Sequence, residues 1–112
     1  MLPDFAAPPF AFVALCTVRF REREDGSPRR IRSDYRCQAR KTQEAASYIE
    51  VRVYLVGSEC AESGEEVPAI LAFLDWEAQR VDWRVGSQFE LCEGRAVTAV
   101  GTVQSLATRS AA

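Results

Sequence analysis

The most distinctive reactive side chains are arginines, which are concentrated in one short stretch. Residues 19–41 hold nine of the 14 basic residues and only four of the 16 acidic ones. Thirteen of the 14 basic residues are arginine, whose planar guanidinium matches the geometry of phosphate or carboxylate. The stretch is therefore a candidate anion-binding surface. The alternative is a solvated strand pair whose arginines face water or neighbouring carboxylates.

The arginines can act together only if their side chains point to the same side of a strand. Side chains two apart on a strand point to one side, and four arginines share even numbering: Arg30, Arg32, Arg36 and Arg40. We expect them to project together, with Asp34 between them weakening the field. Four contacts to the phosphates of a single strand would give a slope of log affinity against log salt of about -2.8.

The four cysteines are the other reactive side chains. Cys16, Cys37, Cys60 and Cys92 have no metal-ligand spacing, and the chain contains no histidine. The lack of histidine removes Cys–His nucleophile pairs and most catalytic zinc sites. Only Cys37, beside Arg36, has a cationic neighbour of the kind that activates a thiol. A small thiol-dependent enzyme built on Cys37 or Cys92 is thus a minor alternative.

Other site motifs are missing from the sequence. No glycine-rich phosphate loop precedes Lys41, no dinucleotide-binding glycine motif occurs, and no calcium-loop ladder is present. No apolar run is long enough to span a membrane, and no secretion signal is recognisable. We therefore expect a cytoplasmic, non-catalytic protein that has free thiols and binds no nucleotide, cofactor, metal or membrane.

The elements that position these side chains form one domain. The 112 residues are 47% apolar and carry a formal charge of -2, as is typical of a globular chain of this size. Residues 1–9 contain three prolines and are expected to form an irregular arm. Residues 10–106 form the predicted domain, and residues 107–112 a frayed tail.

Alternating apolar residues predict an all-β domain, most clearly at Tyr48–Val56. The predicted strands are Phe10–Phe20, Ile31–Lys41, Tyr48–Val56, Ala69–Trp76, Arg80–Val85, Phe89–Leu91 and Val97–Leu106. A turn is expected at residues 25–28 and an acidic loop at residues 58–66. Gly101 indicates a bulge or a close backbone approach within the last strand.

Residues 66–80 also fit a helix. Val67, Ile70, Leu71 and Leu74 recur with helical spacing, and Ser63 and Glu66 are placed like a capping box. The competing interpretation is a buried strand at Ala69–Trp76, and local rules alone leave both open.

Residues 86–103 resemble the end of the third, C-terminal barrel domain of translation elongation factor Tu. Seven residues fall in register with that family without a gap: Gly86, Phe89, Leu91, Glu93, Gly94, Gly101 and Val103. A weaker match places residues 35–38, Tyr-Arg-Cys-Gln, on the family's Tyr-Arg-Pro-Gln motif.

The resemblance implies a closed six-stranded antiparallel Greek-key barrel, and it asks for a strand rather than a helix at residues 69–76. In the family this domain is non-catalytic; it helps to hold the backbone of transfer RNA and contacts the GTPase domain and the exchange factor. The present chain departs from the family near the RNA contact. Arg95 replaces a glycine, Ala96 and Cys92 replace arginines, and Cys37 replaces the proline.

We therefore favour a stand-alone barrel that binds a protein partner, and the resemblance suggests a partner in translation. RNA is the alternative ligand. The oligomeric state is not indicated. The candidate binding residues are Arg32, Arg36, Gln38, Arg40, Glu93, Gly94 and Arg95.

The free-thiol expectation can be checked directly. Protein purified under reducing conditions and then denatured without reductant should show four titratable thiols, because disulfides are rare in a reducing cytoplasm. Ellman titration counts them. Two thiols or none would contradict the prediction.

Overall fold

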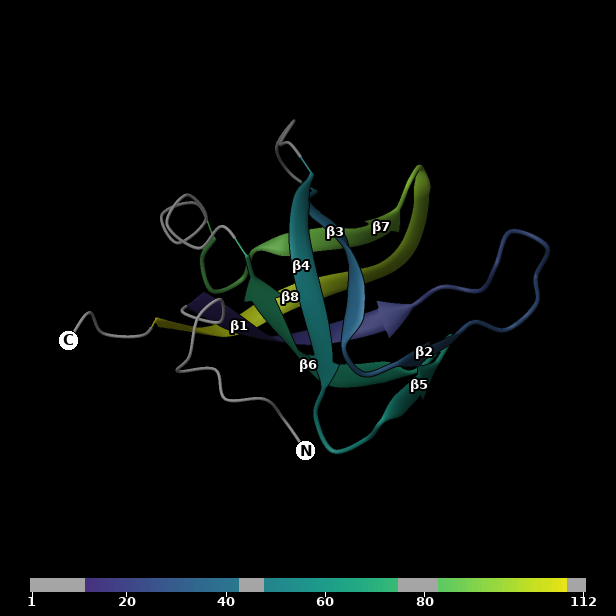
Figure 1. Cartoon of the computed structure of the whole chain (residues 1–112), viewed down its shortest axis with the longest axis horizontal. Coiled ribbons are helices and arrows are strands. Elements are labelled where there is room, and N and C mark those ends of the chain that lie inside the picture. Colours follow the sequence, from purple (N-terminus) through teal and green to yellow (C-terminus); the bar gives the residue numbers. More distant parts are fainter. Residues whose placement is uncertain (1–11, 43–47, 75–82, 109–112) are drawn as a thin grey trace.

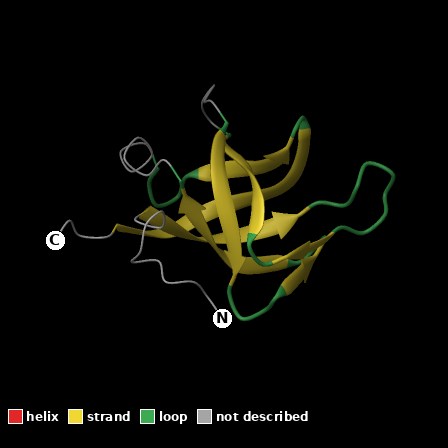
Figure 2. Cartoon of the chain, viewed as in Figure 1, coloured by secondary structure: helices red, strands yellow, loops and turns green. Residues whose placement is uncertain are grey.

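The computed structural model describes residues 12–42, 48–74 and 83–108 of the chain. The arm expected at residues 1–9 lies outside these ranges, as do residues 109–112 of the expected tail. Every regular element of the described part is a β-strand (Figure 2). The last of them ends at Thr108, so residues 107 and 108 continue a strand.

Six antiparallel strands close into a barrel, which confirms the predicted fold class (Figure 1). Their order around the barrel is β1 (Phe12–Phe20), β6 (Glu66–Phe73), β4 (Ile49–Leu55), β3 (Tyr35–Lys41), β7 (Gln88–Glu93) and β8 (Ala96–Thr108). Strand β8 pairs with β1 and completes the ring. Strands β3, β4 and β6 form a meander and β1 lies beside β6, which is a Greek-key arrangement.

The segment with helical spacing is strand β6 in its described part. This confirms the strand expected there, up to Phe73, and the capping-box interpretation of Ser63 and Glu66 is wrong. Leu71 points into the barrel, while Ala72 on the opposite side is also buried. Apolar residues on both faces hide the two-residue period of a strand and produce the helical spacing. Residues 75–80 of the helical alternative lie outside the described residues.

The arginine-rich segment is two strands rather than one. A short strand β2 (Arg30–Arg32) is separated from β3 by a break at which Asp34 has a φ of 65°. Aspartate is one of the few residues that tolerate this left-handed conformation. Strand β2 pairs with β5 (Cys60–Glu62), which lies in the segment expected to be an acidic loop. Ile31 and Ala61 point into the core, so this β2–β5 ribbon covers one end of the barrel.

An aromatic cluster fills the opposite end. The Trp83 ring centroid lies 4.9 Å from that of Phe73 and 5.6 Å from that of Phe89. The strand expected at residues 80–85 is wrong in its described part, because residues 83–85 form a loop and a turn. Trp83 is buried, although it lies in this loop, whereas Val85 is 66% exposed. Residues 80–82 lie outside the described residues.

Strand β8 contains two register shifts and one close approach. The register against β1 shifts between Leu15 and Cys16, and the register against β7 shifts between Leu91 and Cys92, at Thr98, so neither shift falls at Gly101. The Thr98 hydroxyl donates to the Leu91 carbonyl at 3.2 Å. The close approach expected at Gly101 is confirmed, because a Cβ there would lie 2.5 Å from Cζ of Phe89.

Replacing Gly101 by alanine should destabilise the barrel by about 1–3 kcal/mol. The added Cβ would lie 2.8 Å from the Thr17 backbone carbonyl, which cannot rotate away as a side chain can. Urea denaturation measures the change. Ser105→Ala is the matched control, because Ser105 is exposed on the same strand and should change stability by only about 0.5 kcal/mol or less. An alanine at position 101 that left the urea midpoint unchanged would contradict this close packing.

Candidate functional site

The candidate site is the outer surface of two neighbouring strands. The buried core residues of β3 and β4 have odd numbers: Ala39, Val51, Val53 and Leu55. The even-numbered residues therefore face outward. Together with Tyr48, which directly precedes β4, they form what we call the β3–β4 outer face: Arg36, Gln38, Arg40, Tyr48, Glu50, Arg52 and Tyr54. Tyr54 is only 6% exposed.

Arg40, one of the predicted site residues, already has partners on this face. Its Nη2 atom lies 2.7 Å from Oε1 of Glu90 on the neighbouring strand β7. Its guanidinium carbon lies 5.1 Å from the centre of the Tyr48 ring. The hydrogen bond to Glu90 raises the pKa of the Arg40 guanidinium. Because Glu90 offsets this charge, Arg40 contributes a positioned cation–π pair more than a free positive charge.

Arg36 and Arg52 are directly opposite each other across β3 and β4. Among the described residues, no carboxylate lies within ion-pair distance of either guanidinium. The Nε atom of Arg52 is buried and has no hydrogen-bond partner. Burial raises the pKa of the Tyr54 phenol, which lies close to the side chains of Arg52 and Asp34. Tyr54 therefore lies beside Arg52, whose Nε donor is not satisfied within the described part of the protein.

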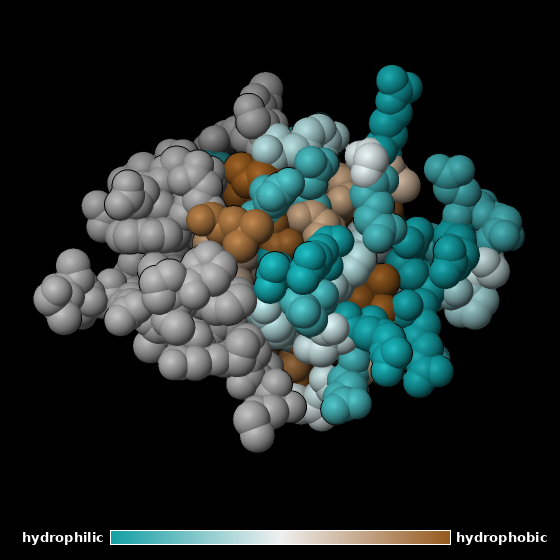
Figure 3. Space-filling model, in the orientation of Figure 1, coloured by the Kyte–Doolittle hydropathy of each residue, from teal (hydrophilic) through white to brown (hydrophobic). Residues whose placement is uncertain are grey.

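A groove of about 460 Å³ runs beside this arginine pair. Its lining is part polar and part apolar: Arg36, Cys37, Gln38, Glu50, Val51, Arg52 and Leu74. Figure 3 views the barrel with β4 in front and shows hydrophilic and apolar residues interleaved there. The groove therefore suits a ligand that carries both kinds of group.

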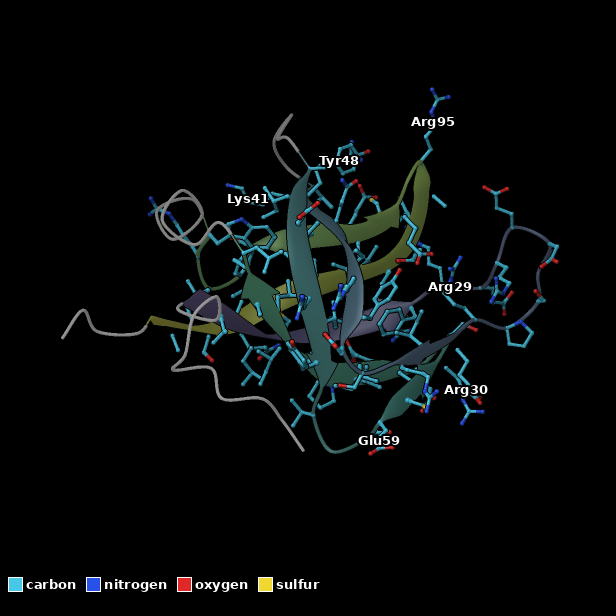
Figure 4. All side chains as sticks on the ribbon, viewed as in Figure 1. Arg29, Arg30, Lys41, Tyr48, Glu59 and Arg95 are labelled. Atoms are coloured by element: carbon cyan, nitrogen blue, oxygen red, sulfur yellow. The ribbon has the colours of Figure 1, made fainter. Side chains whose placement is uncertain are left out.

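Three predicted site residues lie at the hairpin between β7 and β8, apart from the groove lining. Glu93 ends β7, and Gly94 turns the chain with a φ of 59°. The Glu93 carboxylate lies 3.7 Å from the Arg29 guanidinium, and so links this hairpin to the connection between β1 and β2. Arg95 projects from the tip of the hairpin, away from Arg29 and Arg30 (Figure 4).

Arg32 lies on the β2–β5 ribbon, opposite Cys60, and is also separate from the groove lining. The expectation that four arginines share one side of a single strand is wrong. Arg30 and Arg32 belong to β2, whereas Arg36 and Arg40 belong to β3 beyond the Asp34 break. Of the predicted residues, the β3–β4 outer face brings together Arg36, Gln38 and Arg40.

Sequence reasoning missed Tyr48, Arg52 and Tyr54 as site residues. The alternation of Tyr48–Val56 did place them together on the polar side of a strand. What that pattern could not supply was the register that sets Arg52 opposite Arg36. Register depends on which strands pair and on the turns between them, and neither is encoded in one strand alone.

Cys16, Cys37 and Cys92 lack the setting of a nucleophile. Burial raises the pKa of both Cys16 and Cys37 to about 12, and it raises the pKa of Cys92 as well. The Glu93 carboxylate adds to the effect on Cys37. The cationic neighbour Arg36 points to the outer side of β3, so it does not lower the Cys37 pKa as its adjacency in sequence suggested. All four cysteines are free.

Comparisons of the sequence with known proteins do not identify a family. No protein-family model matches the chain, and no curated protein matches it. Within residues 12–42, 48–74 and 83–108, no three histidine, cysteine, aspartate or glutamate side chains are grouped as metal ligands. A search of the same residues finds no helix that could span a membrane.

Alkylation of the folded protein should distinguish the thiols. At pH 8 a thiol whose pKa is about 12 is only about 0.01% thiolate, so Cys16 and Cys37 should react slowly with iodoacetamide. Their rates should rise about tenfold per pH unit through pH 10, since the pKa is raised. Half-buried Cys60 should be modified first. Mass spectrometry of digests measures each site, with Cys60→Ser as the control. A Cys37 rate that levelled off near pH 8.5 would contradict the raised pKa.

Proposed function

We propose that this chain is a non-catalytic interaction module that binds a protein partner through the β3–β4 outer face. The observation that carries the proposal is the composition of that face around its groove. Tyrosine and arginine are the residue types enriched at the energetic centres of protein interfaces. Here Tyr48 is 44% exposed and is stacked under Arg40, while Arg36 and Arg52 line the adjacent groove.

A protein partner accounts for this surface better than RNA does. RNA binding draws most of its affinity from arginines and lysines that neutralise successive phosphates. On this side of the barrel the signs of charge alternate instead. Glu90 neutralises Arg40, and Glu50 lies directly across from Gln38. The arginines that could extend a positive strip, Arg32 and Arg95, belong to the ribbon and to a hairpin tip.

The resemblance to the elongation factor Tu barrel supports the same class of function, because that domain also acts by contact rather than by catalysis. It favours a partner in translation. The four free thiols favour a reducing compartment, and we place the protein in the cytoplasm.

A capture experiment tests the proposal. Immobilised protein is incubated with ribonuclease-treated extract, and bound proteins are quantified against an immobilised Tyr48→Ala variant. We expect one protein in stoichiometric amount whose capture falls at least about tenfold in the variant, as truncation of an interface tyrosine does.

Leu15→Ala is the matched control for this experiment. Leu15 is 41% exposed, much like Tyr48, but lies on β1, which is neighbour to neither β3 nor β4. Its variant should capture the partner as the parent does. Capture that occurs from untreated extract but is lost entirely after ribonuclease treatment would replace the protein partner by RNA. An equal loss of capture in both variants would show that the interface is not on the β3–β4 outer face.

A further inference from the structure

We infer that Arg36 and Arg52 together bind one carboxylate side chain of an extended segment of the partner protein. The inference rests on the proposed function and names the chemistry that the groove recognises. Its starting point is the register, which sets the two guanidinium groups directly opposite each other on the outer side of adjacent strands.

This arrangement is unfavourable in the free protein. Like charges directly opposite on a sheet destabilise it, whereas opposite charges stabilise it. The same fold does place opposite charges together elsewhere, as Arg40 with Glu90 shows. Among the described residues, no carboxylate is within ion-pair distance of Arg36 or Arg52. A local conflict of this kind, without a structural gain, is characteristic of a functional position.

The pair also has an unfilled hydrogen-bonding requirement. A buried polar N–H is normally hydrogen-bonded, but the Nε atom of Arg52 is buried without a partner. A guanidinium has five N–H donors in a planar fork and no acceptor, so only an acceptor group can satisfy it. A carboxylate accepts from two such forks at once, and its negative charge removes the repulsion between them.

The rest of the groove restricts the segment further. The pair Gln38–Glu50 lies two residues along the strands from Arg36–Arg52, a distance of about 7 Å. In an extended segment, side chains two apart are equally spaced and face the same side. The Glu50 carboxylate would repel a second acidic side chain and favour a donor. Leu74, which also lines the groove, offers an apolar contact. We therefore expect an acidic residue followed two positions later by lysine.

Peptide titration of the whole ¹⁵N-labelled chain tests this. The probe is the capped peptide Thr-Glu-Thr-Lys-Thr, with Thr-Gln-Thr-Lys-Thr as its neutral counterpart and Thr-Glu-Thr-Glu-Thr as the doubly acidic one. The first should shift the amide signals of residues 36, 38, 50 and 52, and its affinity should exceed that of either other peptide by at least about fivefold.

Variants separate recognition from folding. Arg36→Gln and Arg52→Gln should each weaken the first peptide at least about fivefold. Arg30→Gln is the matched control; it changes the net charge equally on the exposed part of the ribbon, and binding should not change. Arg36→Glu should abolish binding yet raise the urea midpoint, because it places opposite charges across β3 and β4.

Three results would overturn the inference: equal shifts with the neutral peptide, unchanged binding by both glutamine variants, or a lowered urea midpoint for Arg36→Glu. The capture experiment separates this failure from failure of the proposed function. If a protein is still captured in a Tyr48-dependent way by Arg36→Gln, the module binds a protein but not by this carboxylate contact. If capture from untreated extract is lost entirely after ribonuclease treatment, the proposed function itself fails.

Discussion

Closure of β8 onto β1 is the constraint on which the rest of the molecule depends. Strand β8 is 13 residues long and must pair with β1 on one side and β7 on the other. It does so with two shifts of register, one against β1 beyond Leu15 and one against β7 at Thr98. Bulges bend and twist a strand, which is what a small barrel requires. Gly101 lies between the two shifts and lets the Phe89 ring pack against the backbone.

Because the barrel is closed, residues that stabilise the core alternate along each strand with residues that are free to bind a partner. On β3, Ala39 is fully buried in the core, while its neighbours Gln38 and Arg40 belong to the outer face. Neighbouring residues on a strand are therefore under different structural constraints. The inner ones must fit a fixed volume. The outer ones can hold residues that do little for the fold, and this explains how the opposed pair Arg36–Arg52 is tolerated.

The fold was largely predictable from sequence, and the site only partly so. The alternation of apolar and polar residues in Tyr48–Val56 is a local pattern, and this segment does form strand β4. The short strand β5 was missed because three residues carry too little pattern to distinguish them from a loop. The division of the arginine segment depends on one left-handed residue, Asp34, within a polar stretch. The opposition of Arg36 and Arg52 is a product of pairing register, which no single segment contains.

The β2–β5 ribbon has a consequence for the dynamics of the barrel. Its two strands have three residues each and pair only with one another, whereas every barrel strand has two neighbours. Segments with few paired amides open at lower free energy than the rest of a fold. When the ribbon opens, Ile31 and Ala61 leave the core, and the end of the barrel beside Phe20 becomes accessible to water. Hydrogen exchange at this end should therefore report a sub-global opening at lower free energy than exchange within the strands of the barrel.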